Sequence, residues 1–336
     1  MRQFIHTYDS ITTMEKLLLA WREFLRDKKT KKDVILFEAK LMDNILDLHN
    51  DLKNKTYIHG GYKKFNISDP KPRNIHKASV RDRLLHHAIY RVLYPYFDSK
   101  FIHDSYSCRI GKGTHRAMNQ FRKYFWKVSK NNTKTCWVLK CDIRKFFASI
   151  NHQILKNILA KHIKDPNIIW LLGQVIDSFY STKMLNNSAI AEMLNKGLPL
   201  GNLTSQLLVN IYMNEFDQFM KRELKVKYYI RYADDFIILH EDKNYLNLIL
   251  QYIVVYLKSE LKLNLHPDKV FIKTLASGVD FLGWVHFPKH RVLRTSTKRR
   301  MLKRLKTNLH MRSLQSYLGM LGHGDTGKIK VLLPAR

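Results

Sequence analysis

Two acidic sites in this chain follow apolar segments and could hold metal ions. Asp234 and Asp235 lie between the apolar runs of KYYIRYADDFIILH, and Asp142 follows Trp137-Val138-Leu139 in TCWVLKCDIRKFFASI. Adjacent like charges are costly unless a cation lies between them. A solvated acidic turn would explain the Asp-Asp pair taken alone. The third carboxylate, after a second apolar run, favours a common site.

Three carboxylates on neighbouring strand ends would supply the hard oxygen ligands that Mg²⁺ prefers. Two such ions, about 3.5–4 Å apart, stabilise both the attacking and the leaving oxygen of an in-line phosphoryl transfer. We therefore expect Asp142, Asp234 and Asp235 to hold two Mg²⁺ ions, with Mn²⁺ as a possible substitute. The expected chemistry is transfer of a nucleotide to a primer 3′-hydroxyl.

Hydrophobic patterning predicts the elements that must position these acids. Two short strands are expected within 62–78, around Asp69-Pro70, and a buried strand at 137–142. A hairpin is expected over 227–240, and two further strands at 270–275 and 279–287. The helices are expected at 12–29, 34–56, 81–97 with an end near Pro95, 114–129, 152–163, 167–182, 203–224, 243–260 and, as one helix or a pair, 295–321. The fold class is therefore α+β: an antiparallel sheet carries the acids, with helices on one side and a basic helical tail.

The charge balance predicts a polyanionic partner. Lys and Arg number 59 against 28 Asp and Glu, which gives a formal charge of +31. There is no acid between Asp104 and Asp142, where nine Lys or Arg lie, and none between Asp280 and Asp325, where ten lie. One-signed stretches repel themselves unless an opposite charge lies against them. A merely basic surface from a Lys-rich proteome is the alternative, but nucleic acid explains the clustering better.

Cysteine usage and hydropathy bear on the compartment. Cys108, Cys136 and Cys141 have neither metal-ligand spacing nor an even number, which predicts reduced thiols in the cytosol. The most apolar helical stretch, YLNLILQYIVVYL, contains Asn247 and falls short of the roughly 18 residues that cross a bilayer. We expect a cytoplasmic protein with no membrane partner.

The same residues resemble a known family. Tyr232-Ala233-Asp234-Asp235 resembles the YxDD box of reverse transcriptases, and Asp142-Ile143-Arg144-Lys145-Phe146-Phe147 resembles their first palm motif. KPRNIHKASVRDR (71–83), SYSCRIGKGTHRA (105–117), LNLHPDK (263–269) and VDFLGW (279–284) resemble the other blocks, in the family's order over roughly residues 60–310. The resemblance implies a bacterial or phage-encoded enzyme that makes cDNA from RNA.

The resemblance also implies a division of the chain. It predicts a right-hand polymerase fold with an N-terminal helical extension at 1–57, fingers at 58–136 and a palm at 137–285. The palm would contain inserted fingers and connecting helices at about 154–199, and a basic helical thumb would follow at 286–336. We expect no RNase H, zinc-finger or endonuclease unit within this sequence.

Further site residues follow from motif position. The backbone carbonyl of Ile143 would join the metal ligands, and Lys269 would protonate the leaving pyrophosphate, although a solvated Lys or a role for His266 is an alternative. Arg73 and Lys71 would contact the triphosphate by charge-assisted hydrogen bonds, or the template backbone instead. Phe147, five residues after Asp142, would exclude the ribose 2′-hydroxyl, unless it is an ordinary core residue.

Nucleic acid would lie along two basic stretches and one turn. The candidates are Arg109, Lys112, Arg116, Phe281, Leu282, Gly283, Lys298, Arg299, Arg300, Lys303 and Arg304. The last five lie on the predicted thumb helix, whose apolar stripe would be Leu302, Leu305 and Leu309. A solvated helix face is the alternative.

The segment GLPLGNLTSQ (197–206) departs from the pattern of group II intron and retron enzymes. Leu200 stands where they have Gln, and Gln206 stands where they have Pro; with Gly201 these residues would line the nucleotide site. The departure resembles enzymes of diversity-generating retroelements, where it accompanies error-prone copying opposite adenine, and related antiviral reverse transcriptases. The implied partners are a structured non-coding or template-repeat RNA, a DNA or RNA primer, dNTPs and a small basic accessory protein.

Two other functions are compatible with these motifs. A reverse-transcriptase fold could hold RNA without chemistry, but loss of a catalytic carboxylate would mark such a scaffold, and all three are present. A polymerase making RNA is the other, and Phe147 argues against it.

Overall fold

The computed structural model describes residues 3–68, 72–179, 195–307 and 311–331. The chain forms two compact units and crosses between them several times. The first unit contains Met1–His103, Ile143–Glu223 and Val255–Asn264, and the second contains Asp104–Asp142, Leu224–Val254 and Leu265–Arg336. Each unit is built from segments far apart in the sequence, and each is described by itself below.

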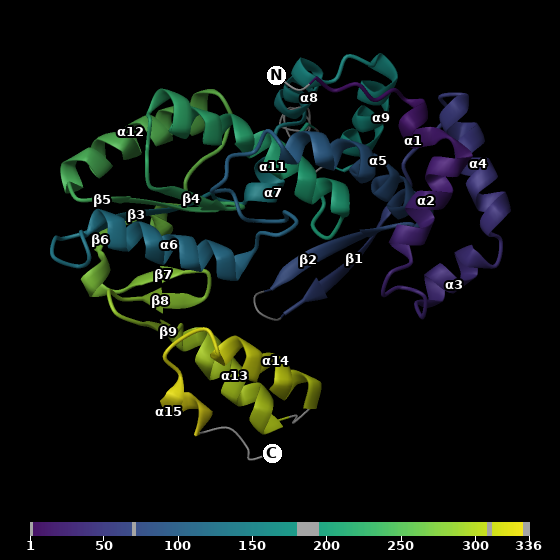
Figure 1. Cartoon of the computed structure of the whole chain (residues 1–336). Helices are drawn as coiled ribbons and strands as arrows, with labels where there is room; N and C mark the ends of the chain where they lie inside the picture. The colour runs from purple at the N-terminus through teal and green to yellow at the C-terminus, as the bar shows by residue number, and fades with distance from the viewer. Residues whose placement is uncertain (1–2, 69–71, 180–194, 308–310, 332–336) are drawn as a thin grey trace, which may run out of the picture. The chain divides into compact units, whose positions relative to one another are not determined.

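Helices make up most of the first unit (Figure 1). They are α1 (Asp9–Thr12), α2 (Met14–Phe24), α3 (Lys32–Glu38), α4 (Leu41–Lys53), α5 (Val80–Asp98), α7 (Phe146–Ser149), α8 (His152–His162), α9 (Pro166–Asp177) and α11 (Leu203–Gln218), the last continuing as a π-turn at Phe219–Glu223. α5 begins at Ser79, whose hydroxyl oxygen accepts the backbone N–H of Asp82, a standard N-cap.

Three helix predictions in this unit were wrong in detail. The helix expected at 12–29 is α2, which spans only Met14–Phe24. The single helix expected at 34–56 is two, α3 and α4, separated at Ala39-Lys40. Ile35 and Leu36, counted toward its apolar face, are 51% and 65% exposed, so only α4 has a continuous buried face. α5 also runs through Pro95 to Asp98, because burial of Tyr94, Tyr96 and Phe97 outweighs the loss of one helical hydrogen bond.

The β1–β2 hairpin of the first unit matches its prediction. β1 (Tyr62–Ile67) and β2 (Arg73–Ala78) are antiparallel, with Tyr62 opposite Ala78 and Ile67 opposite Arg73. Most side chains of β1 are exposed, so packing of this strand cannot by itself hold the hairpin in place. Lys71 lies outside the described residues.

The second unit contains the predicted antiparallel sheet. Its strand order is β4-β5-β3-β6, with β3 at Trp137–Asp142, β4 at Tyr229–Tyr232, β5 at Asp235–His240 and β6 at Phe271–Thr274. α6 (Thr114–Val128) packs on the face that contains Val138 and Ile237. Figure 1 shows α12 (Lys243–Ser259), which belongs to this unit as far as Val254, along the other side. Helices therefore lie on both sides, which corrects the expectation of one side.

A smaller sheet and three helices complete this unit. The sheet is β7 (Val279–Phe281), β8 (Trp284–His286) and β9 (Arg291–Leu293), and the helices are α13 (Thr295–Thr307), α14 (Met311–Leu321) and α15 (Gly327–Lys330). Met301 and Leu305 are the buried residues of α13, whereas Leu302 is half-buried. Met301 was missed in the predicted stripe, and Leu309 lies outside the described residues.

The fold class is α+β, as predicted. Within the described ranges, no helix has both the length and the apolar character needed to cross a bilayer.

Candidate active site

The carboxylates of Asp142 and Asp235 leave the sheet on the same side. β3 and β5 are antiparallel with Asp142 directly opposite Asp235, and cross-strand partners share a face. Side chains alternate along a strand, so Val138, Lys140 and Asp142 point toward the same side as Ile237. That side is covered by α6 at Val138 and Ile237, while the acids occupy the strand ends.

Asp234 lies in the turn that joins β4 to β5. Tyr232 and Asp235 are cross-strand partners, so Ala233 and Asp234 form a two-residue turn, in which Ala233 has φ +57°. The guanidinium of Arg231, which is fully buried, donates to the carbonyl of Ala233 at 3.1 Å and to Ser105 Oγ at 3.0 Å. A buried cation therefore fixes the turn that presents the acidic pair.

Asp235 is only partly paired. Lys140 Nζ lies 3.4 Å from its Oδ2, while its Oδ1 is buried without a hydrogen-bond partner. Burial raises the pKa of Asp235 to about 7; Lys140 lowers it, and the Asp142 and Asp234 charges raise it further. Such a carboxylate is poised to gain a cation, because a positive charge would relieve both the desolvation and the repulsion.

Lys269 contacts the other strand-end acid. Its ammonium donates to Asp142 Oδ1 at 2.9 Å, and the backbone N–H of His266 donates to the Asp142 carbonyl at 2.7 Å. The turn Pro267–Lys269 is a short 3₁₀ helix capped by the His266 side chain. The structure thus places Lys269, a proposed proton donor, beside the acids, at 44% side-chain exposure.

The carboxylate oxygens are the type of ligand that a hard divalent cation prefers, but they do not lie close enough together to hold one. In the part of the chain that the structure describes, no three carboxylate, imidazole or thiolate side chains meet closely enough to hold an ion. Lys140 and Lys269 take up carboxylate oxygens that metal ions would otherwise use. Mutual repulsion among the acids opposes closer approach without a cation, and the orphaned Asp235 Oδ1 fits a ligand role.

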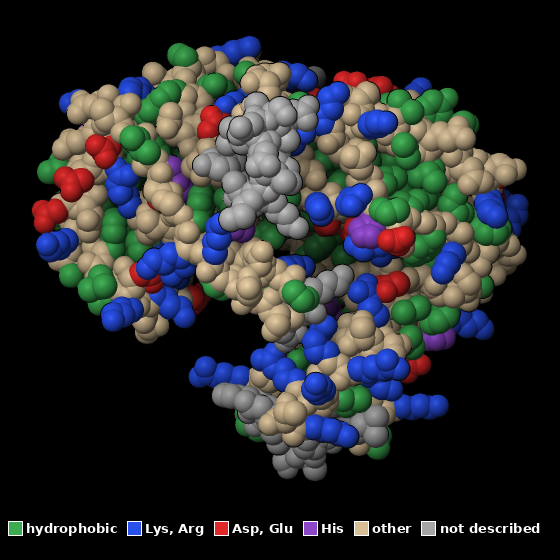
Figure 2. All heavy atoms as spheres, turned by 180° about the vertical axis from the view of Figure 1, so that it is seen from behind, with side chains coloured by type: hydrophobic (Ala, Val, Ile, Leu, Met, Phe, Trp, Pro, Cys, Tyr) green, Lys and Arg blue, Asp and Glu red, His purple; other side chains and the backbone are tan. Residues whose placement is uncertain are grey.

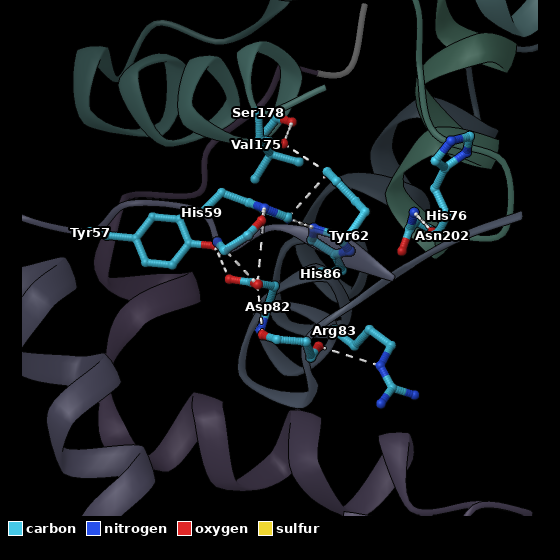
Figure 3. A network of polar contacts seen from close by, with 12 residues as sticks. Tyr57, His59, Tyr62, His76, Asp82, Arg83, His86, Val175, Ser178 and Asn202 are labelled. Atoms are coloured by element: carbon cyan, nitrogen blue, oxygen red, sulfur yellow. Dashed lines mark hydrogen bonds and ion pairs between the residues drawn. The ribbon is translucent and has the colours of Figure 1, made fainter. Parts of the chain in front are cut away.

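The 197–206 loop of the first unit joins α7 to the β1–β2 hairpin. The N–H of Leu198 donates to the Phe147 carbonyl at 2.8 Å, and the carbonyl of Leu200 accepts the N–H of His76 at 3.0 Å. Asn202 Nδ2 then donates to the His76 carbonyl at 2.9 Å, as Figure 3 shows. Both backbone groups of His76 in β2 are therefore held by this loop.

Gly201 allows the close approach. Its φ is +104°, and an added Cβ would lie 2.8 Å from Ile75 Cγ2. Phe147, Leu200 and Gln206 are each half-buried, and Arg73 is exposed at the start of β2. Five predicted nucleotide-site residues, Arg73, Phe147, Leu200, Gly201 and Gln206, thus belong to the first unit, whereas the acids belong to the second.

A buried polar network anchors the root of the hairpin (Figure 3). The Asp82 carboxylate accepts the Tyr57 hydroxyl at 2.8 Å, the Ser79 hydroxyl at 2.6 Å and the Gly60 N–H at 3.2 Å. Tyr62, the first residue of β1, forms a 2.8 Å hydroxyl–hydroxyl hydrogen bond with Ser178. These contacts substitute for the missing strand packing and hold the hairpin that contains Arg73.

The family model described as reverse transcriptase (RNA-dependent DNA polymerase) matches residues 62–286, more than half of the chain. The chain belongs to the reverse transcriptase family. Protein YkfC of Escherichia coli is 26% identical over 263 residues, covering 69% of this chain and 66% of YkfC. The group II intron-encoded protein LtrA of Lactococcus lactis is 23% identical over 333 residues, covering 80% and 53%.

This reverse transcriptase also shares its fold with a solved telomerase. Telomerase from Candida tropicalis, in complex with the TWJ fragment of telomeric RNA, superposes with a TM-score of 0.51 at 13% identity, covering 78% of this chain and 51% of that chain. The likeness supports the right-hand polymerase fold. The chain spans about two thirds of YkfC and about half of LtrA.

The basic side chains of the reverse transcriptase's second unit are placed as follows. Lys112 Nζ lies 5.0 Å from the Tyr106 ring centroid, Arg109 donates to the Ser105 carbonyl at 3.0 Å, and Arg116 is exposed on α6. On α13, Arg299, Lys303 and Arg304 are exposed, whereas Lys298 and Arg300 are half-buried. Figure 2 shows Lys and Arg side chains projecting from the lower part of the view, where α13 and α14 lie.

The three residues predicted to contact nucleic acid at the turn between β7 and β8 differ in exposure. Phe281 is fully buried in the core against α6, so its side chain supports the turn rather than reaching nucleic acid. Leu282 (φ +53°) and Gly283 (φ +88°) form the turn and are half-buried. The expectation of a direct contact therefore stays with Leu282 and Gly283.

Sequence reasoning missed Lys140, Arg231 and Asn202. Lys140 is 8% exposed and donates to the Asp280 carbonyl at 2.9 Å; Asp280 in turn pairs with Arg294, just before α13. The signal was present in the alternation of β3, which puts residue 140 on the face of Asp142. For Arg231 the same alternation gave no signal, because one of its guanidinium partners, Ser105 Oγ, comes from a distant segment.

Proposed function

We propose that this reverse transcriptase copies an RNA template into DNA by two-metal-ion nucleotidyl transfer. The observation that carries the proposal is the register of β3 and β5, which sets Asp142 opposite Asp235 with Asp234 in the adjoining turn. The orphaned Oδ1 of Asp235 supports it. Family membership supplies the reaction class.

In this proposal Asp142, Asp234, Asp235 and the backbone carbonyl of Ile143 hold the ions. When bound, Mg²⁺ lowers the pKa of the primer 3′-hydroxyl and neutralises charge that develops on the triphosphate. Lys140 offsets part of the carboxylate charge, and Arg231 keeps the turn in place. Lys269, whose ammonium donates to Asp142 Oδ1, would protonate the leaving pyrophosphate.

The incoming dNTP would be bound by residues of the first unit. Arg73, and Lys71 two residues before it in the sequence, would contact the triphosphate by charge-assisted hydrogen bonds. Phe147 would oppose a ribose 2′-hydroxyl, and its backbone is held by Leu198. Leu200, Gly201 and Gln206 would lie near the templating base, with residues 58–136 acting as fingers, 137–285 as palm and 286–336 as thumb.

The partners we propose are an RNA template, a DNA or RNA primer and a small basic accessory protein. The +31 charge supports binding of a polyanion. Leu200 supports a role in a diversity-generating retroelement or in antiviral defence, because an apolar side chain replaces an amide beside the template. Sequencing the RNA that copurifies separates the two: a template repeat indicates diversification, and a lone structured RNA indicates defence.

The central test is Asp234→Asn in Mg²⁺-dependent incorporation of dNTPs on a primed RNA template. Removal of one formal charge from the ligand set should lower the rate by at least about 100-fold, the scale of a lost transition-state stabiliser. Glu241→Gln, an exposed carboxylate just after β5, is the matched control and should retain the wild-type rate. Undiminished synthesis by Asp234→Asn would refute the assignment.

The alternative function is a catalytically weak RNA-binding scaffold with this fold. It predicts equally slow dNTP incorporation by the wild type and by Asp234→Asn, together with tight RNA binding by both in a separate binding measurement.

A further inference from the structure

A cavity of about 500 Å³ lies in the first unit, apart from every residue assigned above to polymerisation. The segment before α1 and the C-terminal parts of α5, α8 and α11 surround it. Its volume falls within the range of small-molecule sites, about 300–1,000 Å³. All of its lining residues belong to one unit, so its shape does not depend on how the two units are arranged.

The cavity has a positive charge excess. Lys100, Lys161, Lys164 and Arg222 line it, against the single carboxylate of Glu215, which accepts Lys161 Nζ at 3.1 Å. Cations at helix C-termini commonly offset the helix dipole, so part of this charge has a structural role. The ends of α5, α8 and α11 each contribute about half a negative charge, which still leaves about one and a half positive charges in excess.

One wall of the cavity is aromatic. The rings of Phe4 and Tyr96 meet edge to face with centroids 5.2 Å apart, and His162 contacts Tyr96 with centroids 5.9 Å apart. Lys100 Nζ lies 5.2 Å from the Tyr96 centroid. Burial lowers the pKa of His162; Glu215 opposes this shift, and Lys100 and Lys161 add to it. The wall therefore presents uncharged rings beside the cations.

We propose that this cavity is a second nucleotide-binding site, which holds phosphate with Lys100, Lys164 and Arg222 and packs the base against Phe4. Cations beside flat rings match the two parts of a nucleotide, since phosphate binds by charge-assisted hydrogen bonds and a base packs on an aromatic face. The nucleotide is either free or one unit of an RNA strand. The site would anchor it without taking part in nucleotidyl transfer.

The test measures binding by the full chain in EDTA, which leaves no divalent ions for the acidic site. The probes are fluorescently labelled adenosine monophosphate and a labelled four-nucleotide RNA. The variants are the double substitution Lys164→Gln/Arg222→Gln and, separately, Phe4→Ala. Lys29→Gln/Lys40→Gln is the matched control. Both side chains are exposed and lie in the same unit, and the double substitution removes two positive charges, as the cavity variant does.

We expect both cavity variants to bind at least about tenfold more weakly than the control and the wild type, with primer extension unchanged. Loss for both probes assigns a free nucleotide, and loss for RNA alone assigns a unit of a strand. Equal loss in the control would reduce the effect to general surface charge and overturn the proposal. A second outcome would also overturn the proposal: inorganic phosphate displaces the probes, but Phe4→Ala and Phe4→Leu leave their binding unchanged. The site would then recognise phosphate without the base. Since no step requires catalysis, failure of the polymerase proposal would leave this result intact.

Discussion

A carboxylate at the end of a buried strand is stable only if its charge is offset. Asp235 illustrates this at the scale of one residue: burial and two neighbouring acids raise its pKa to about 7, and Lys140 is the cation that opposes them. Asp142 has its own cation in Lys269. Both lysines are therefore part of the electrostatic balance of the acidic site, which a divalent ion would alter.

Phe147 provides the residue-scale prediction. Phe147→Ala should reduce discrimination against ribonucleotides by about 10-fold to 200-fold, the range that a pocket gives for a difference of one methylene group. The measurement is the ratio of kcat/KM for a dNTP and its rNTP. Tyr252→Ala, which removes a ring that is 48% exposed on α12, should leave the ratio unchanged. An unaltered ratio for Phe147→Ala would show that this ring is not the gate.

At the scale of elements, the 197–206 loop is the joint between α7 and the hairpin. The loop binds the Phe147 carbonyl on one side and both backbone groups of His76 on the other. Backbone contacts of this kind tolerate different side chains at Leu200. They do not tolerate a displaced backbone, which makes the loop sensitive at Gly201.

Gly201→Ala should lower the stability of the first unit by about 1–3 kcal/mol and raise KM for dNTPs. The reasons are a strained φ of +104° and a Cβ 2.8 Å from Ile75 Cγ2. Gly173→Ala is the control: it lies within α9 with nothing within 4 Å of the added Cβ, so it should gain about 0.5–1 kcal/mol. Thermal unfolding and dNTP titration measure both effects, and a Gly201→Ala protein as stable as wild type would contradict the argument.

At the scale of the whole molecule, the charge of +31 predicts salt-sensitive binding of RNA. We expect a variant with five Gln substitutions on α13 to reduce the slope of log K against log salt by about three times 0.7–0.9, because three of the five side chains are exposed. The substituted residues are Lys298, Arg299, Arg300, Lys303 and Arg304. Met301 and Leu305 are retained, so α13 should still pack.

The slope is measured by salt titration of RNA binding for the wild type, Asp234→Asn and the five-Gln variant. Asp234→Asn should keep the wild-type slope, since in the proposed function the acids bind metal rather than phosphate. A wild-type slope for the five-Gln variant would instead assign phosphate binding to the basic stretch at 105–140.

Acid should destabilise the protein through its buried imidazoles. Burial, with the Arg291 charge, lowers the pKa of His286 to about 4, whereas an unfolded His titrates near 6.5. Above pH 6.5 the His286 imidazole is neutral in both the folded and the unfolded protein, so its protonation does not lower the free energy of unfolding there. It falls toward pH 4, because the unfolded state takes up the proton first, by up to about 1.4 kcal/mol per pH unit.

His286→Gln should therefore flatten the loss of unfolding free energy between pH 7.5 and 5, whatever its effect at neutral pH. Urea unfolding across that range provides the measurement. His290→Gln removes an exposed imidazole from the same unit and should keep the wild-type pH dependence. A variant curve parallel to wild type would exclude His286 as a source of the acid sensitivity.

Local patterns determined the elements of this protein and the order of its motifs. Alternating or continuous apolar runs predicted β3, the acidic hairpin and the helices around them, because the periodicity of a strand or helix is written in adjacent residues. The same locality explains the errors. Whether Ile35 and Leu36 are buried, and whether a helix continues through Pro95, depends on neighbours from elsewhere in the chain.

Only the tertiary structure decided which residues support the acids. Lys140 meets Asp280, Arg231 meets Ser105, and His76 meets Leu200, pairs separated by more than a hundred residues. The cavity of the first unit likewise draws its lining from four separate segments. Sequence by itself determined the carboxylates and the family resemblance. Contacts between distant residues have no local period, so their electrostatic balance appeared only when the chain was folded.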